Sequence, residues 1–312
     1  MPELRRDALS GRWVLLAPGR AARPHTFSPP APDTPATVAD CPFCPGHEAL
    51  TPPEVYRTGD GAPDTPGWRV RVVPNLYPIV GGADAGPGAT GAHEVVVLSP
   101  AHGKSFAQIT EQQAVEVLTV LRDRARHHLA AGHAFVQVCI NHGRAAGASI
   151  EHPHAQLVAL DFVPPAAEHA VARVTAAGHD LVAADLEAAE EALLVVDGSA
   201  PVWCASAPGT PYELRVALRA PGARFEDVEA EIELVAHAAR DALARLAATI
   251  GDVPYNLVVV NAPPGVEPDA FHWYIEIQTR VAVPAGFEQG TGILVNTTPP
   301  EVAARHLREA ET

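Results

Sequence analysis

Hydrophobic and polar positions along the chain predict several short strands and two long helices. Four runs rich in Val, Ile and other apolar residues are typical of strands. They span 93–98, 134–140, 256–260 and 274–277. Two segments rich in Ala, Leu and Arg, 110–131 and 225–250, have a helical pattern. Segments rich in Pro, Ala and Thr (20–40) or in Gly and Ala (81–91) predict surface loops, so the fold class is mixed α and β.

The strand and loop pattern of the first half recurs in the second. Residues 93–103 align without gaps with residues 212–222, and a long helix is predicted after each copy. An Asn and a His at the same spacing also recur, as Asn141 with His152 and as Asn261 with His272. An ancient duplication would explain this recurrence, and chance similarity of strand–loop–helix patterns is the alternative. We therefore expect two similar halves, 1–165 and 166–312.

The two copies differ in the residues that carry chemistry. In the alignment of the two copies, His102 corresponds to Pro221, His154 to Tyr274 and Gln156 to Glu276. Nothing in the second half matches the close pair Cys41 and Cys44. We expect the chemistry in the first half, with the second half completing the pocket.

Composition narrows the classes of function. The chain has 312 residues, enough for one large domain or two packed halves, and 47% of them are hydrophobic. No run approaches the roughly 18 apolar residues of a membrane span, and no signal peptide is recognised, so we expect a cytoplasmic protein with no membrane partner. A net charge of −15 without a run of Lys and Arg argues against nucleic acid. An anionic substrate would need a locally positive pocket.

Residues 141–156 combine a glycine-rich loop with two histidines. The small residues of this loop, Gly147 among them, would let backbone N–H groups approach phosphate oxygens closely. His152 and His154 are two positions apart, which on a strand puts both rings on one face, and Gln156 projects to the same face as His154. An arbitrary pair of histidines is more often held by hydrogen bonds in a core.

Four cysteines are too few for a disulfide framework, but two of them form a Cys-x-x-Cys pair. Cys41 and Cys44 have the spacing of a zinc knuckle, which needs two more ligands, and His102 and His152 are the candidates. His47 is a rival ligand because it lies close in sequence. A redox pair and two unrelated buried cysteines are the alternatives. The remaining two most resemble packed core cysteines: Cys139 and Cys204.

The pattern Asn-x-Gly-x-x-x-Gly-x-Ser-x-x-His-Pro-His-x-Gln at 141–156 resembles the active-site signature of the galactose-1-phosphate uridylyltransferase branch of the histidine-triad superfamily. The resemblance implies that His154 is the nucleophile and is covalently nucleotidylated, while His152 binds zinc. It implies an α+β fold of two tandem histidine-triad-like halves, with a mainly antiparallel sheet flanked by helices. Three residues are implied around the nucleotide phosphates: Asn141, Ser149 and Gln156.

The resemblance also selects the metal ligands. Segment 99–105 resembles the family's third-ligand segment. One structural zinc site is therefore implied, with the ligands Cys41, Cys44, His102 and His152. Zinc on His152 would immobilise the strand that carries His154. Some relatives carry a second metal in the second half, which we do not expect here because Pro221 stands opposite His102.

Three further segments resemble parts of the family's pocket. Segment 13–24 resembles an entry segment whose arginines approach the base and phosphates, which implies that role for Arg20 and Arg23. Ordinary solvated loop charges are the alternative. Segment 73–78 resembles one whose Asn, here Asn75, contacts the nucleotide. The tail at 287–301 resembles the sugar-side segment, with Glu288, Gln289, Thr291 and Gly292.

The function implied by the resemblance is nucleotidyl transfer between a nucleotide sugar and a sugar 1-phosphate by a ping-pong mechanism. Uridylyl transfer between UDP-glucose and galactose 1-phosphate is the expected activity. An ADP-glucose phosphorylase with phosphate as acceptor is the alternative, since galactose-handling enzymes typically have Tyr-Glu where Thr291 and Gly292 stand. A histidine-triad hydrolase would normally have His in place of Gln156, and a non-enzymatic nucleotide-binding protein is a further alternative. The resemblance alone implies a homodimer.

Overall fold

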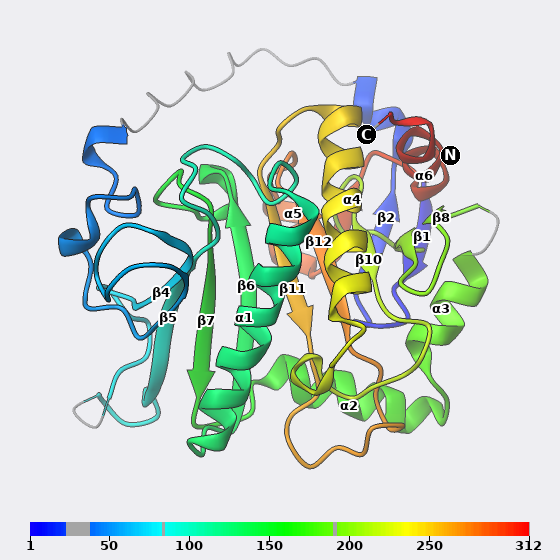
Figure 1. Cartoon of the computed structure of the whole chain (residues 1–312). Helices are drawn as coiled ribbons and strands as arrows, with labels where there is room; N and C mark the ends of the chain where they lie inside the picture. The colour runs from blue at the N-terminus through cyan, green and yellow to red at the C-terminus, as the bar shows by residue number, and fades with distance from the viewer. Residues whose placement is uncertain (23–37, 83–84, 190–191, 312) are drawn as a thin grey trace.

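Ten strands form one antiparallel sheet in the computed structural model, which describes residues 1–22, 38–82, 85–189 and 192–311 (Figure 1). The strand order is β3-β4-β5-β7-β6-β11-β12-β10-β9-β8. The bounds are β3 (Tyr56–Gly59), β4 (Trp68–Pro74), β5 (Gly91–Val97), β6 (Phe135–His142), β7 (His154–Leu160), β8 (Leu194–Val196), β9 (Val202–Cys204), β10 (Leu214–Val216), β11 (Tyr255–Val260) and β12 (Tyr274–Thr279). A smaller sheet contains β1 (Glu3–Arg6), β2 (Trp13–Leu16) and β13 (Leu294–Asn296).

The order of the central strands is mirrored about the β6–β11 pair. On one side lie β6, β7 and β5, and on the other β11, β12 and β10. The copies that align in the sequence therefore occupy equivalent places, because β5 begins the first copy and β10 lies in the second. This arrangement confirms the α+β class with a mainly antiparallel sheet. The boundary between residues 165 and 166 stays a prediction.

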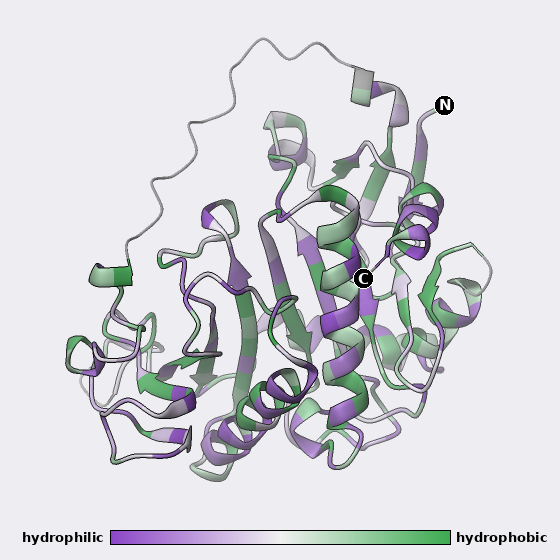
Figure 2. Cartoon of the chain, turned by 45° about the horizontal axis from the view of Figure 1, so that its top comes forward, coloured by the Kyte–Doolittle hydropathy of each residue, from purple (hydrophilic) through white to green (hydrophobic). Residues whose placement is uncertain are grey.

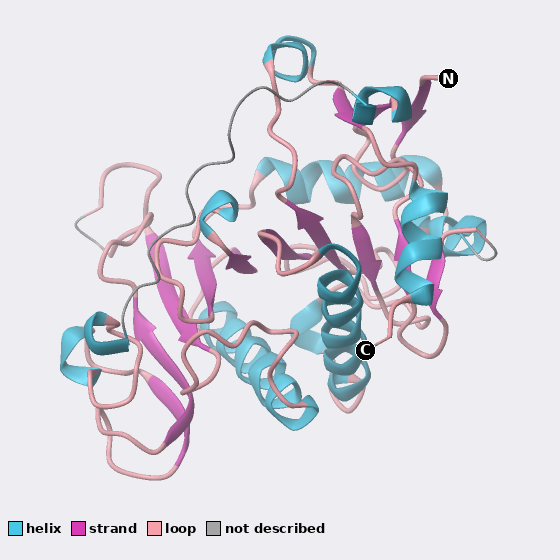
Figure 3. Ribbon diagram, turned by 90° about the horizontal axis from the view of Figure 1, so that it is seen from above, coloured by secondary structure: helices cyan, strands magenta, loops and turns pink. Residues whose placement is uncertain are grey.

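Two long helices cover one face of the sheet, as Figure 3 shows from above. They are α1 (Glu111–Ala130) and α4 (Ile232–Ile250). Alternate residues of β6 and β7, such as Val138 and Leu157, join Leu118 and Leu121 of α1 in the main hydrophobic core. Both helices carry hydrophilic and hydrophobic positions in turn in Figure 2, as expected for helices with one face on a core.

The predicted helix at 110–131 is confirmed, because Thr110 caps α1 by accepting a hydrogen bond from the backbone N–H of Gln113 at 3.2 Å. The predicted helix at 225–250 begins too early. Residues Phe225–Asp227 form a short 3-10 turn, and α4 begins at Ile232. Asn261 accounts for the difference, since its side chain bonds the backbone N–H of Phe225 and the carboxylate of Glu226.

Four shorter helices complete the described structure: α2 (Pro165–Ala177), α3 (Leu181–Ala189), α5 (Gly286–Thr291) and α6 (Pro300–Glu309). None of them was expected from the sequence pattern. A search of the described helices finds none that is long and apolar enough to cross a membrane.

The face of the sheet opposite α1 and α4 carries polar side chains, and we call it the polar face. Over the strands of the second half, this face is filled by an ion network to which Asp7 and Arg12 of the first half also contribute. Arg215 of β10 is fully buried and donates hydrogen bonds to Asp7 and Asp185, each at 2.7 Å. Arg12 donates to Glu213 at 2.9 Å and to Glu276 at 3.3 Å. These charges occupy the space around the ring of Tyr274, over which the Arg215 guanidinium lies at 5.7 Å.

We expect Arg215→Met to lower the free energy of unfolding by about 3–5 kcal/mol, because Asp7 and Asp185 would keep buried charges without their main cation. Arg219→Met is the matched control, since Arg219 pairs with Asp197 at the surface. Its loss should cost less than about 1 kcal/mol. Urea denaturation measures both, and equal losses would contradict the importance of the buried network.

Candidate active site

The strand register places polar side chains in rows across the polar face. Asn256 of β11 lies opposite Asn141 of β6 and opposite Gln278 of β12. The same register, continued by one residue beyond the Ile140–Ala155 pair, brings Asn141 opposite His154. Residues opposite each other on neighbouring strands have side chains about 5 Å apart on one face. Polar side chains from four strands therefore form one row, and two of them, His154 and Asn141, are predicted site residues.

His154, the first residue of β7, has a geometry suited to a nucleophile. The residue is 6% exposed, and its ring lies 5.4 Å from the ring of Phe43. Its Nδ1 is 2.8 Å from the backbone oxygen of His152, which can only accept, so Nδ1 carries the proton. Burial lowers the pKa of the ring. The ring is therefore neutral, and Nε2 has a lone pair.

Gln156 follows on the same face and is oriented by His93 of β5. The backbone N–H of Ile79 donates to Nδ1 of His93 at 3.3 Å, so the proton is on Nε2. This Nε2–H donates to Oε1 of Gln156 at 3.0 Å. Burial lowers the pKa of His93, which keeps the ring neutral. The amide NH₂ of Gln156 is thereby directed away from His93 and can donate to a ligand.

Asn75 adjoins the same histidine. Its Oδ1 accepts the backbone N–H of Tyr77 at 2.8 Å, and its Nδ2 lies 3.2 Å from Nε2 of His93. Because that Nε2 already carries a proton, the NH₂ group of Asn75 has no acceptor there. Asn75 and Gln156, both predicted from the sequence, are thus brought together by a histidine to which sequence reasoning gave no role.

The glycine-rich loop leaves β6 through a turn that requires glycine. Gly143 has φ +78°, and a Cβ there would lie 3.0 Å from Cβ of Pro254. Asn256 holds the loop in place, because its Nδ2 donates to Oδ1 of Asn141 at 2.7 Å and to the backbone oxygen of Ala146 at 2.8 Å. Gly147 also has positive φ, +91°.

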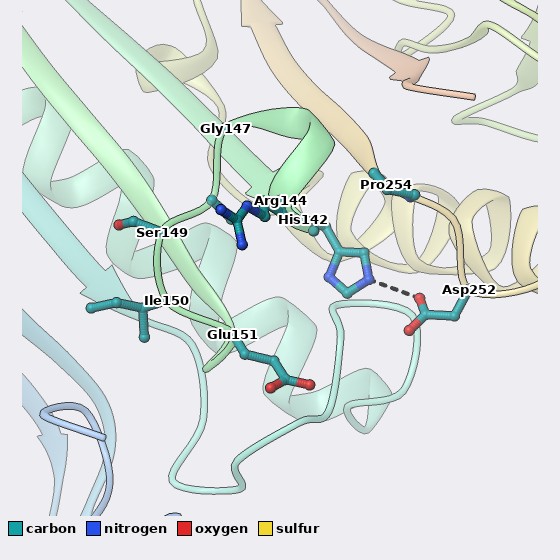
Figure 4. Close-up of a pocket in the computed structure, with 10 residues that line it drawn as sticks. His142, Arg144, Gly147, Ser149, Ile150, Glu151, Asp252 and Pro254 are labelled. Atoms are coloured by element: carbon teal, nitrogen blue, oxygen red, sulfur yellow. Dashed lines mark hydrogen bonds and ion pairs between the residues drawn. The ribbon is translucent and has the colours of Figure 1, made fainter. Parts of the chain in front are cut away.

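The loop separates two clefts. The loop cleft, of about 680 Å³, is shown in Figure 4. It includes Ser149, Glu151 and Arg144, together with His142, whose Nε2 is 2.7 Å from a carboxylate oxygen of Asp252. The sheet cleft, of about 580 Å³, lies against the polar face. Its lining residues are Gln137, Cys139, Asn141, Ala145, Ala146, Asn256, Val258, Arg280, Ala282, Val283 and Pro284.

Cys139 does not lie in the hydrophobic core, where the sequence analysis placed it. The sequence suggested a packed core cysteine, but the side chain is half-buried, lies opposite Gln156 and lines the sheet cleft. Its position on β6 has the same parity as Asn141, which faces the polar side. Cys204 is buried at 1% exposure, as expected.

The four predicted metal ligands lie together. One ligand atom from each of Cys41, Cys44, His102 and His152 lies within 4.8 Å of the others. Nδ1 of His152 is 3.6 Å from both sulfurs, and Nδ1 of His102 is 3.3 Å from Sγ of Cys44. Ligands bound tetrahedrally at zinc distances would be about 3.6 Å apart, so the donor set fits such an ion.

The surroundings of this Cys₂His₂ group favour metal over redox chemistry. Nε2–H of His152 donates to the backbone oxygen of Ser99 at 2.7 Å, which leaves the Nδ1 lone pair for a metal. Burial lowers the pKa of His152 to about 4, so the ring is neutral. Burial raises the pKa of Cys44 to about 11, whereas a redox cysteine needs a lowered pKa. His47 bonds the backbone oxygen of Cys41 and lies outside the group.

Among the predicted residues that the structure describes, several line neither cleft: Asn75, His154, Gln156, Arg20, Glu288, Gln289, Thr291 and Gly292. Arg20 lies exposed in the short 3-10 helix Pro18–Ala22, and Arg23 lies outside the described residues. The tail residues form α5, where the Glu288 carboxylate accepts the backbone N–H of Ala285 at 2.9 Å and so caps the helix. Gln289 and Thr291 are in the same helix, and Gly292 ends it. Their sugar-side role stays a prediction.

Comparison with known proteins places the chain in a family. A family profile described as a domain of unknown function, DUF4921, matches residues 95–310. The ADP-glucose phosphorylase of Arabidopsis thaliana is 30% identical over 333 residues, which covers 99% of this chain and 93% of that protein. The galactose-1-phosphate uridylyltransferase of Thermotoga maritima is 26% identical and covers 100% and 99%.

The chain belongs to the galactose-1-phosphate uridylyltransferase-like family. Within this family, the crystal structure of the Arabidopsis thaliana ADP-glucose phosphorylase with bound ADP-glucose superposes with a TM-score of 0.87 at 27% identity, covering 100% of this chain and 99% of that chain. The resemblance stated from residues 141–156 is confirmed at the level of the family. Membership makes the chain a nucleotidyltransferase of this type.

We expect His102→Ala to lower both the metal content of the purified protein and its melting temperature, because one of four ligands is lost. Elemental analysis and thermal unfolding measure the two effects. His47→Ala is the matched control and should retain the metal, since His47 lies outside the Cys₂His₂ group. Unchanged metal in His102→Ala would contradict the ligand set.

Proposed function

We propose that the chain transfers a nucleoside monophosphate from a nucleotide sugar to Nε2 of His154 and then to a phosphate-bearing acceptor. The observation that carries this proposal is the hydrogen bond from Nδ1–H of His154 to the backbone oxygen of His152, which leaves the lone pair on Nε2. The neighbouring donors support it, because the amide groups of Gln156 and Asn141 lie on the same face. The glycine-rich loop offers backbone N–H groups beside them.

The first step forms a phosphorus–nitrogen bond. The Nε2 lone pair attacks the α-phosphorus, and the bond from that phosphorus to the bridging oxygen breaks. The sugar 1-phosphate leaves with the electron pair, while the Nδ1 proton stays in its hydrogen bond to His152. Gln156 and Asn141 are proposed to hold the phosphate oxygens, since catalysis of phosphoryl transfer rests on positioning and charge stabilisation. The same role for Ser149, which lines the loop cleft, rests on the sequence resemblance alone.

The second step returns the histidine to its starting state. An oxygen of the acceptor phosphate attacks the α-phosphorus, the phosphorus–nitrogen bond breaks, and the electron pair returns to Nε2. No proton needs to enter or leave the ring. The sequence of two displacements at one histidine makes the scheme ping-pong.

The proposed nucleotide sugar is ADP-glucose, with inorganic phosphate as acceptor and ADP and glucose 1-phosphate as products. Support comes from the relative of that name, which aligns over 99% of this chain, and from the tail residues Thr291 and Gly292. Uridylyl transfer between UDP-glucose and galactose 1-phosphate is the second candidate. The Thermotoga maritima relative, which aligns over the whole chain, favours it.

The proposed metal is one zinc ion held by the Cys₂His₂ group. Bound zinc would supply rigidity, because it would tie His152 to the Cys41–Cys44 segment. Immobilising His152 also fixes the backbone oxygen that orients His154. Arg20 and Asn75 are proposed nucleotide contacts, and a homodimer and a cytoplasmic location stay proposals.

Covalent labelling tests the proposed function. The protein is incubated separately with ADP-glucose and UDP-glucose labelled at the α-phosphate, and is quenched in base. We expect base-stable label on the wild-type protein and on His169→Ala, an exposed control, but not on His154→Ala. The covalent mechanism would be excluded if the wild-type protein carried no label after either incubation. It would also be excluded if the His154→Ala protein became labelled.

A chase of the labelled protein identifies the acceptor. Release of ADP by phosphate supports the phosphorylase, whereas release of UDP-galactose by galactose 1-phosphate supports the uridylyltransferase. If the label is released as the nucleoside monophosphate in water, without either acceptor, the protein is a hydrolase and not a transferase.

We expect His93→Phe to slow formation of the labelled intermediate by about tenfold at saturating nucleotide sugar, since a loss of roughly 1.4 kcal/mol of positioning changes a rate by that factor. Phe keeps the ring but removes the Nε2–H that orients Gln156. His93→Gln retains an N–H donor and should recover most of the rate. Rapid-quench kinetics measures both, and equal rates in His93→Phe and wild type would contradict the orienting role.

A further inference from the structure

The sheet cleft contains one charged residue among the described residues that line it, Arg280. The other lining groups are amides, a cysteine and apolar side chains. Although the net charge of the chain is −15, the described residues that line this cleft of about 580 Å³ include a basic group and no acidic one. A basic group in such a cleft attracts anionic ligands.

The guanidinium of Arg280 is held by neutral groups. Its Nε donates to Oδ1 of Asn256, and one terminal nitrogen donates to Oε1 of Gln278 at 3.2 Å. Within the described part of the chain, no carboxylate pairs with it. The two arginines of the ion network differ in this respect, because Arg12 and Arg215 each contact at least two carboxylates. Arg280 is oriented without being neutralised.

The same hydrogen bonds direct a second donor into the cleft. Both N–H groups of the Asn256 amide are used, one on Oδ1 of Asn141 and one on the backbone oxygen of Ala146. With its oxygen occupied, Asn141 presents its NH₂ group to the cleft that both residues line. Asn141 and Arg280 therefore offer N–H donors, and no acceptor, to one ligand.

The cleft adjoins the nucleophile. Cys139, which lines it, lies opposite Gln156, and the continued register brings Asn141 opposite His154. The cleft is thus lined by β6, the strand that is hydrogen-bonded to the strand that begins at His154. The occupant is thus placed as the group that leaves in the first step or attacks in the second.

We propose that Arg280 and Asn141 form a subsite for a phosphate monoester or inorganic phosphate, the leaving or attacking partner of the nucleotidyl group. This inference rests on the proposed function. A guanidinium binds phosphate through paired N–H donors, and here it also offsets the charge that develops on the leaving oxygen. Arg280 is the residue that distinguishes a phosphate-bearing acceptor from water.

Binding without turnover tests the subsite. Calorimetric titrations of wild type, Arg280→Met and Arg280→Lys use inorganic phosphate and glucose 1-phosphate separately. We expect Arg280→Met to weaken binding by about tenfold or more, and Arg280→Lys to recover part of it because the charge is kept. Arg219→Met, at an exposed ion pair, is the control and should bind as wild type. Weakening for only one of the two anions identifies that anion as the occupant.

The two proposals fail in different ways. Wild-type affinity for both anions in a folded Arg280→Met protein, with label still formed on His154, would overturn the subsite and leave the proposed function intact. Arg280-dependent anion binding without any label on His154 would overturn the covalent function and leave the anion subsite. In a labelled Arg280→Met protein, we expect a raised KM for the acceptor in the chase and faster loss of label to water relative to transfer.

Discussion

The pairing register of β7 with β5 and β6 is the constraint on which the site depends. Ala155 and Leu157 pack into the core under α1, so His154 and Gln156 must face the other way. A shift by one residue would bury the polar pair and expose the apolar one, at a cost no functional contact could offset. Core packing thereby determines which side chains reach the substrate, and His93 and Asn141 on neighbouring strands are aligned by the same pairing.

The strands of the two halves have the same arrangement, but the polar side chains that they carry differ in function. In the first half, the polar face carries neutral amides and histidines with donors left over for a ligand. On the strands of the second half, Arg12 and Arg215 are matched by four carboxylates, and Arg12 and Asp7 of this network come from the first half. Tyr274 occupies the position that corresponds to His154 in the sequence alignment of the two halves. Satisfied charges of this kind stabilise a fold but leave nothing to bind an anion. The two halves therefore differ in how many polar groups of this face already have a partner within the protein.

Much of this could be predicted from the sequence, because local patterns determine it. The strands at 93–98 and 134–140, helix α1 and the four metal-ligand residues follow from periodicity, capping and motif. The start of α4 could not, since Asn261 holds the preceding residues by contacts that are distant in sequence. The roles of His93 and Arg280 also depend on register between strands far apart in the chain. The three-residue strands β8, β9 and β10 are too short to leave a periodic signal.

The central pairing of β6 with β11 has a consequence for how such a chain can change over evolutionary time. Either half alone would leave one of these strands as an uncovered edge, with backbone groups open to pairing with any other chain. Joined in one polypeptide, each half protects the edge of the other. Loss of the half without a nucleophile would therefore expose β6 as an edge strand and also remove Asn256 and Arg280 from the sheet cleft, so we expect the two halves to be kept together.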